Sequence, residues 1–406
     1  MPTNVSLRPL KVDYGEYRRQ VIFDCFKWDP QVGDINTICD HAAVLSSSTA
    51  SQLADWSESL ARETMQLEDA LSERTDLFRE LGLPRSLTEV LTRKRSKALG
   101  EHVRVMRFDF HPTPTGWAIS EVNSDVPGGF SEASALPRLA ARFVSGTRVF
   151  GDVGGTLLAA LTGRIGSRRR VAFVHATSYS DDRQVMQYLA SRFEGAGHKP
   201  VWAAPDHLRW RNGNATAIAD GQEGPVDAVV RFYPAEWLPQ LPRSSNWQDY
   251  FAAGTPTCNH PRAVLTQSKR LPLIWDRLGI ELPTWRRLLP ETCDHRQVRW
   301  KQDPRWVIKP ALGRVGDGIA WRNLLAAKEW RSICVDTMFS PRCWVAQRRF
   351  ESQPLATSSG ERHLCIGSFT VDGKAAGFYG RLSASPRIDH QAQDIAVLVD
   401  GAEVAV

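Results

Sequence analysis

The spacing of apolar residues along the chain predicts mostly helices in its first hundred residues. Apolar side chains recur every three or four positions over residues 51–81, which is typical of an amphipathic helix. Gly82-Leu83-Pro84 ends this pattern, and a further helix is expected over 84–99. Residues 26–34 are expected to form an ordered loop. We therefore predict a mainly helical N-terminal region over residues 1–100.

A strict alternation replaces this helical pattern at residues 103–122. Val103–Phe110 and Trp117–Val122 read as strands, and the Pro- and Gly-containing segment 112–116 between them is typical of a turn. In such a β-hairpin Asp109 and Glu121 would lie near each other across the two strands. Asn123 would share the face of Glu121, because side chains alternate with a period of two.

The remaining chain alternates between predicted strands and helices. A helix is expected over 181–195 with Ser180 as its N-cap, and another over 268–278. Strands are expected over 171–175, 199–204, 228–233, 306–309, 344–350, 364–371 and 374–381, the last two joined by an Asp372-Gly373 turn. The prediction is an α/β (α+β) fold in four regions: 1–100, 101–165 with the hairpin, a central α/β subdomain at 166–255, and 256–406.

Composition narrows the function classes. The net charge is +6, but the basic residues are spread along the chain, so a nucleic-acid binder is not expected. Seven cysteines without a C-x-x-C pair argue against a zinc ribbon or a disulfide framework and favour a reducing cytoplasm. No apolar run of about 18 residues is present, so no membrane span is expected.

A lysine and a glycine-rich segment form the first candidate for chemistry. Lys309 ends a short apolar strand, and Gly313, Gly316 and Gly318 would let the backbone approach phosphate oxygens. Arg314 adds a guanidinium for phosphate or carboxylate. The segment is neither a Walker A loop nor a dinucleotide fingerprint, and an ordinary glycine turn with an exposed lysine is the alternative.

The hairpin acids form the second candidate. Asp109, Glu121 and Asn123 offer the hard oxygen ligands that Mg²⁺ prefers. Salt bridging, with Arg107 as the obvious partner, is the alternative. Since Mg²⁺ usually binds one or two carboxylates together with substrate phosphates, the acids and the lysine segment together predict Mg²⁺ and ATP.

Four further positions are weaker candidates. The strand containing Gln347 could offer main-chain groups to an adenine, although a plain edge strand reads the same way. Arg381 ends a strand and could neutralise a phosphoryl group, or be an exposed structural arginine. Asp181 and Asp182 are candidates for binding a cationic amine, but acids in the first turn of a helix also simply stabilise it.

Taken together and in this order, these segments resemble the glutathionylspermidine synthase family, whose synthetase is an ATP-grasp ligase. R-F-D-F followed by E-x-N resembles the family's metal segment, which implies Asp109, Glu121 and Asn123 as Mg²⁺ ligands and Arg107 near the reacting phosphate. Asn259-His260-Pro261 followed by Lys269 resembles its first ATP lysine. K-P-x-x-G-R-x-G resembles its second lysine and lid loop, which carries over Lys309 and Arg314. The Gln347 strand resembles the adenine hinge, the Gly377–Arg381 segment the late arginine, and the Arg231–Trp237 segment a part of the central domain.

The resemblance implies a rearranged ATP-grasp fold in which the metal acids precede the lysine loop. It implies an ADP-forming carboxylate–amine ligase acting through an acyl phosphate, with Arg107, Arg314 and Arg381 stabilising charge and Lys269 and Lys309 holding phosphates. A peptide-like acid such as glutathione and an amine such as a polyamine are the implied partners, and Ser124 and Asp125 are added as substrate contacts. A ligase for other peptide, amino-acid and amine substrates, and a non-catalytic ATP-binding protein, are the rivals.

The chain also departs from the family. Bifunctional members carry an N-terminal cysteine-dependent amidase, for which no room precedes Arg107, so amidase activity is expected to be absent. Residues 382–399 do not match the family's tail, which leaves the acceptor-binding region open.

Overall fold

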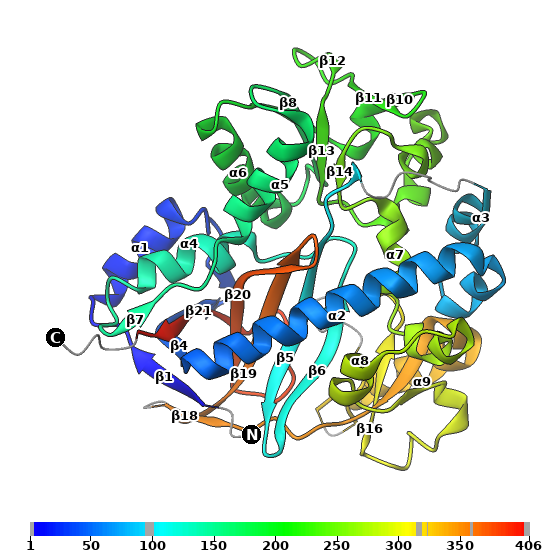
Figure 1. Ribbon diagram of the computed structural model, residues 1–406. Helices are drawn as coiled ribbons and strands as arrows, with labels where there is room; N and C mark the ends of the chain where they lie inside the picture. The colour runs from blue at the N-terminus through cyan, green and yellow to red at the C-terminus, as the bar shows by residue number, and fades with distance from the viewer. Residues whose placement is uncertain (1–3, 94–100, 314–318, 323, 358–359, 402–406) are drawn as a thin grey trace.

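The computed structural model describes residues 4–93, 101–313, 319–322, 324–357 and 360–401 (Figure 1). Its centre is a mixed sheet whose main path runs β1-β4-β21-β20-β19-β5-β6, with β18 added to β19 and β7 to β21. The strands are β1 Val5–Pro9, β4 Ile38–Leu45, β5 Val105–Thr113, β6 Gly116–Asn123, β7 Thr147–Arg148, β18 Leu355–Thr357, β19 Gly360–Val371, β20 Lys374–Ser383 and β21 Gln393–Asp400. Only the β21–β4 pairing is parallel within this sheet's described strands.

Helices cover both faces of this sheet. The long helix α2, Ser47–Glu73, crosses one face (Figure 1), and Ala43 and Leu45 of β4 pack into the same core as its leucines. The neighbouring β4 residues Ala42 and Val44 instead pack with helices α1, Tyr14–Asp24, and α4, Phe130–Ala140. Because successive side chains of a strand point to opposite faces, α2 and the α1–α4 pair lie on opposite sides of the sheet.

Two smaller sheets flank the main one. The first is parallel, in the order β14-β13-β8-β9, with strands Thr257–Cys258, Ala228–Arg231, Arg170–Val174 and Lys199–Ala203; α5, Val153–Ile165, and α6, Ser180–Gly195, pack with it. The second is antiparallel, in the order β15-β17-β16, with strands Thr292–Cys293, Trp344–Arg348 and Trp306–Pro310, and α9, Ala327–Phe339, packs against it. Shorter elements are β2 Gln31–Val32, β3 Ile35–Asn36, β10 Leu208–Arg211, β11 Asn214–Ala217, β12 Gly224–Pro225, α3 Arg85–Arg93, α7 Val264–Gln267 and α8 Pro283–Leu288.

The structure confirms the mixed α/β class and most predicted elements after residue 100, including the hairpin β5–β6 and helix α6. The predicted helix over 268–278 is wrong: two 3₁₀ turns, Leu271–Leu273 and Trp275–Leu278, stand in its place. The long helix also ends at Glu73, and Thr75–Leu81 is 3₁₀. Strands β1, β4 and β21 were missed. The four-region division of the chain stays a prediction.

None of the helices in the described ranges combines the length and the apolar character needed to cross a membrane.

Candidate functional site

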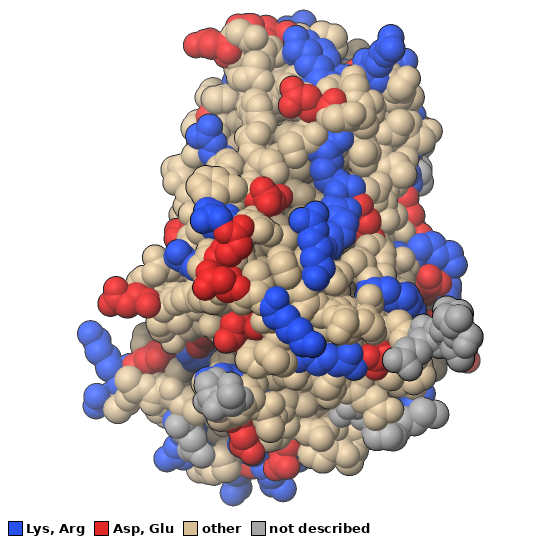
Figure 2. All heavy atoms as spheres, turned by 90° about the vertical axis from the view of Figure 1, so that its left-hand side faces the viewer, with Lys and Arg blue, Asp and Glu red and all other residues tan. Residues whose placement is uncertain are grey.

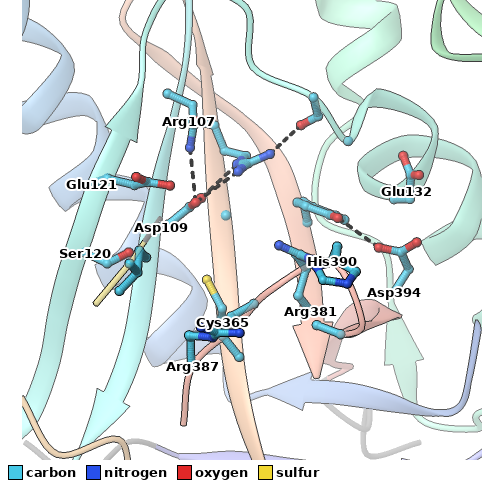
Figure 3. A pocket seen from close by; sticks show the side chains of 18 of the residues that line it. Arg107, Asp109, Ser120, Glu121, Glu132, Cys365, Arg381, Arg387, His390 and Asp394 are labelled. Carbon is cyan, nitrogen blue, oxygen red and sulfur yellow. Dashed lines mark hydrogen bonds and ion pairs between the residues drawn. The ribbon is translucent and has the colours of Figure 1, made fainter. Parts of the chain in front are cut away.

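A cleft of about 560 Å³ opens between the main sheet, the β16–β17 pair and the start of α6. This volume is within the range of pockets that hold small molecules and cofactors. Most residues singled out from the sequence line it: Arg107, Asp109, Glu121, Asn123, Asp181, Asp182, Lys309, Gln347 and Arg381. Figure 3 shows Asp109 and Glu121 on one side of the pocket and Glu132 and Asp394 on the other.

The hairpin brings Asp109 and Glu121 together as expected. The strand register shifts between Phe108 and Phe110, so that Asp109 faces a bulge in β6 that contains Glu121. Arg107 donates from Nε and Nη2 to the two carboxylate oxygens of Asp109, at 2.8 and 2.9 Å, and Asn123 Nδ2 donates to Oδ2 at 3.1 Å. In this structure Asp109 therefore forms a salt bridge with Arg107, which was the alternative to metal binding.

Neighbouring backbone groups and one aromatic ring hold the guanidinium of Arg107 in place. Nη1 donates to the carbonyl of Gly128 at 2.7 Å, and the guanidinium carbon lies 5.1 Å from the ring centroid of Tyr379. A Cβ on Gly367 of the neighbouring strand would come within 2.7 Å of Arg107 Cδ, so a larger residue there would displace the arginine. Arg107 is thus fixed between the two sides of the cleft.

Glu121 is paired with the first predicted phosphate lysine. Lys269 Nζ lies 2.9 Å from Glu121 Oε2 and donates to the carbonyl of Gly313 at 2.6 Å. Burial alone would raise the pKa of Glu121, but Lys269 and Lys309 outweigh it and hold that pKa at about 2. The Lys269 amide also donates to Ala311 O at 2.9 Å, which ties this residue to the start of the glycine-rich segment.

Lys309 is buried beneath the same acids. Its Nζ donates to Gln347 Oε1 at 2.7 Å and to Ser120 O at 3.1 Å. Burial lowers its pKa to about 8, with Glu121 acting in the opposite direction. Gln347 in turn donates to Thr292 Oγ1 at 3.0 Å, so its side chain orients Lys309. Arg314, Gly316 and Gly318 lie outside the described residues.

Arg381 lies on β20 beside a segment that was not foreseen as part of the site. Its Nη2 donates to the carbonyl of Asp389, and residues 384–392, between β20 and β21, bring Arg387 and His390 to the cleft. Arg387 is held by Asp389, with Nη2 at 3.0 Å from Oδ2. The only sequence signal was the Arg387-Ile388-Asp389-His390 cluster itself.

The opposite end of the cleft is acidic. We call it the acidic end and define it by Asp29, Glu132, Asp181, Asp182 and Asp394. Asp181 and Asp182 lie in the first turn of α6, and Gln184 Nε2 donates to Asp181 at 3.1 Å. Burial raises the pKa of Asp181; Lys27 opposes this rise, while Asp29, Glu132 and Asp394 add to it. Sequence reasoning missed Glu132 and Asp394. Figure 2 shows that acidic and basic side chains also gather separately on one face of the molecule.

Ser124 and Asp125, predicted as substrate contacts, do not line the cleft. Both are fully buried beyond the end of β6. Asp125 forms an ion pair with Arg231 and accepts from the Ala235 amide at 2.8 Å, while Ser124 Oγ contacts Thr266 Oγ1 at 2.7 Å. Their side chains connect the hairpin to the neighbouring segments, because the chain turns away from the sheet face after Asn123.

We call the end of the cleft beside the hairpin the basic end and define it by Arg107, Lys269 and Lys309. Its residues suit Mg²⁺ and the phosphates of ATP. Asp109, Glu121 and Asn123 carry oxygen atoms of the hard type that Mg²⁺ prefers, and each of the two carboxylates already faces a cationic partner. Arg107 and Lys309 line the cleft, whereas Lys269 does not line it and adds its charge from behind Glu121; such cations are of the kind that binds phosphates.

A model of the glutathionylspermidine synthase preATP-grasp family matches residues 15–400. Among solved structures, a glutathione synthetase-like effector from Globodera pallida in apo form is similar, with a TM-score of 0.60 and 12% identity over 95% of this chain and 97% of that chain. A putative gamma-glutamylcysteine synthetase from Methylobacillus flagellatus KT gives a TM-score of 0.44 and 12% identity over 79% and 86%. No curated protein matches. At this identity, the likeness to the effector concerns the fold alone.

Proposed function

The chain belongs to the glutathionylspermidine synthase family, and from this premise we propose that it is a carboxylate–amine ligase that uses ATP. The family match confirms the resemblance read from the sequence. The reaction we propose is ADP-forming and passes through an acyl phosphate.

The observation that carries this proposal is the division of one cleft into two ends of opposite charge. The basic end holds Lys269, Lys309 and Arg107 around the hairpin acids, which suits a nucleotide triphosphate with its metal ion. The acidic end suits a cationic amine. A ligase needs both partners at one place, because holding them together supplies much of the rate.

The proposed chemistry has two steps. A carboxylate oxygen of the acid attacks the γ-phosphorus of ATP, and ADP leaves. The amine nitrogen then attacks the acyl carbon, loses a proton and forms the amide bond, while phosphate leaves with the electrons of the carbon–oxygen bond. Arg107 and Arg381, which both line the cleft, would stabilise negative charge on the transferring group.

Each group at the basic end has a distinct part in this proposal. Lys269 and Lys309 would bind phosphate oxygens, and Gln347 would orient Lys309 through its hydrogen bond. Asp109, Glu121 and Asn123 would hold Mg²⁺, which supplies neutralisation of phosphate charge when bound. Arg314, Gly316 and Gly318 are assigned to the loop that closes over the phosphates on the strength of the family resemblance.

The experiment measures ADP and phosphate release from Mg-ATP with glutathione or an amino-acid mixture, each without added amine, with polyamines and with monoamines. The proposal requires release that depends on both an acid and an amine, and a product whose mass is that of the pair less one water. Release with glutathione alone would indicate that water replaces the amine at the acyl phosphate, so that the net reaction is ATP hydrolysis. No release with any pair would refute the ligase.

One observation favours a second candidate, a non-catalytic ATP-binding protein. Both hairpin carboxylates are engaged by cations of the chain itself, Asp109 by Arg107 and Glu121 by Lys269. If these pairs persist in the nucleotide complex, no carboxylate is released to the metal. Tight binding of ATP that is unaffected by removing Mg²⁺, without ADP release, would identify this alternative.

A further inference from the structure

The acidic end of the cleft already holds an ammonium group of the chain. Lys27 Nζ lies 2.9 Å from Glu132 Oε1 and 2.7 Å from Asp394 Oδ2. The side chains of the three residues are 16%, 10% and 8% exposed, so this is a nearly buried triad rather than a surface pair. All three line the cleft.

The two carboxylates have their remaining oxygens satisfied. Tyr379 Oη donates to Asp394 Oδ1 at 2.8 Å, and Ser131 Oγ donates to Glu132 Oε2 at 2.9 Å. Each carboxylate therefore presents one oxygen to the same ammonium. This arrangement would hold any primary ammonium, because nothing in it depends on the atoms of the lysine stem.

The backbone that carries Lys27 is anchored on both sides. Its amide donates to Val21 O at the end of α1, at 3.3 Å, and the Trp28 amide donates to Gln184 Oε1 on α6, at 2.9 Å. The Phe26 ring packs against Tyr188 of α6, with centroids 6.0 Å apart. The ammonium is therefore placed by the fold and is not a mobile surface group.

The triad of Lys27, Glu132 and Asp394 also borders a second cavity. A second, small cavity of about 10 Å³ is also lined by Lys27, Glu132 and Asp394. Lys27, Glu132 and Asp394 thus border both the cleft and this cavity. Removal of the lysine would enlarge the space beside the triad and leave two buried carboxylates without a counter-charge, which is a costly state unless another cation enters.

Asp181 and Asp182 offer further negative charge close to the triad. The pKa of Asp181 is influenced by Lys27, Glu132 and Asp394 together, which places these groups within electrostatic reach of one another. An ammonium of an incoming amine would have the carboxylates at the start of α6 as counter-charges, in the same part of the cleft as the position that Lys27 fills.

We propose that Lys27 determines which amine the cleft accepts: its ammonium fills the position that the second ammonium of a diamine would occupy, so the protein selects amines with a single cationic group. The inference rests on the proposed function, since it specifies the class of the amine substrate. It assigns Lys27 a role in specificity and none in bond formation.

The test is calorimetric binding of 1,4-diaminobutane and of butylamine, the matched monoamine, to the full chain and to its Lys27→Met variant without ATP. We expect the preference for the diamine over the monoamine to rise by about tenfold or more in the variant. A preference that changes by less than about twofold would overturn the proposal. Lys27→Leu, which also removes the ammonium and keeps an apolar side chain, is the second variant if Lys27→Met does not fold.

A charge-balanced control separates the ammonium position from general electrostatics. The double variant Lys27→Met with Asp394→Asn removes one positive and one negative charge, and the Asn oxygen still accepts from Tyr379. It should lose most of the gain in diamine preference. An undiminished gain would mean that the diamine binds elsewhere and would also overturn the assignment.

Failure of this inference and failure of the proposed function give different results. The binding measurement uses no ATP, so it holds or fails whether or not ADP is released. An unchanged diamine preference with amine-dependent ADP release would refute the role of Lys27 alone. A raised preference without any ADP release would refute the ligase and leave Lys27 as a selector of bound amines.

Discussion

The buried amine of Lys309 leads to a prediction about stability. Its Nζ has two hydrogen-bond acceptors, Ser120 O and Gln347 Oε1, yet burial lowers its pKa from 10.5 to about 8. At about 1.4 kcal/mol per pH unit, this difference means that the charged form costs the folded state about 3 kcal/mol. On the proposed function, this cost is the consequence of holding a cation for phosphate binding in a buried position.

The sign of the pH effect follows from proton linkage. Between the folded pKa of about 8 and the ordinary value of 10.5, the unfolded chain holds a proton on Lys309 that the folded chain has released. Stability from this residue therefore rises as the pH rises through that window. In a Lys309→Met variant this rise is absent, so the free energy of unfolding of the variant, relative to the wild type, should fall as pH increases.

The assay is urea unfolding followed by fluorescence, for which the fourteen tryptophans provide the signal. From about pH 7 to about pH 9.5, the unfolding free energy of Lys309→Met minus that of the wild type should become more negative by about 2 kcal/mol. Lys27→Met is the matched control: Glu132 and Asp394 hold the pKa of this second buried lysine well above its usual value despite its desolvation, so its difference should stay constant. A Lys309→Met difference that is equal at both pH values would refute the reasoning.

Three further changes have expected outcomes. Asp109→Asn removes a proposed metal ligand and the counter-charge of the nearly buried Arg107, so ADP release should fall at least about 100-fold and the melting temperature should fall as well; normal turnover would refute the metal assignment. Asp125→Asn leaves Arg231 fully buried without a counter-charge and should cost about 3–5 kcal/mol in urea unfolding, whereas a loss below about 1 kcal/mol would contradict the pairing. Burial lowers the pKa of His102 to about 4, so between pH 6.5 and 4 the wild type should lose about 3 kcal/mol more stability than His102→Asn; parallel acid unfolding of the two would contradict this.

The parts of the site that were predictable from the sequence depend on short-range patterns. Alternation and the turn residues at 112–116 are sufficient for the β5–β6 hairpin, and the hairpin alone places Asp109 opposite the segment that contains Glu121. The pairing of Lys309 with Gln347 was not predicted, because it depends on the contact between strands β16 and β17, and the two residues are 38 positions apart. The hairpin inference required only the period of a strand and the residues of its turn.

The parts that were missed depend on contacts between distant segments. Lys27 and Glu132 are 105 residues apart, and no local pattern marks Lys27 as different from a surface lysine. The expected helix over 268–278 is replaced by 3₁₀ turns because Pro272 interrupts the helix, and Arg270 donates to the carbonyls of Glu80 and Trp344 instead. Tertiary hydrogen bonds thus override a helical apolar pattern that was real but weak.

The two ion pairs at the basic end can be understood as exchangeable rather than as a barrier to ligand binding. Without a ligand, Arg107 and Lys269 neutralise Asp109 and Glu121, so neither of these two buried carboxylates is left without a counter-charge. On the proposed function, Mg²⁺ and anionic phosphates arrive together. Metal ion and carboxylates can then pair with one another while the phosphates pair with Arg107 and Lys269, so that every charge keeps a partner. ATP without its metal would leave the carboxylates facing phosphate, and we therefore expect this end of the cleft to select the magnesium complex over free ATP.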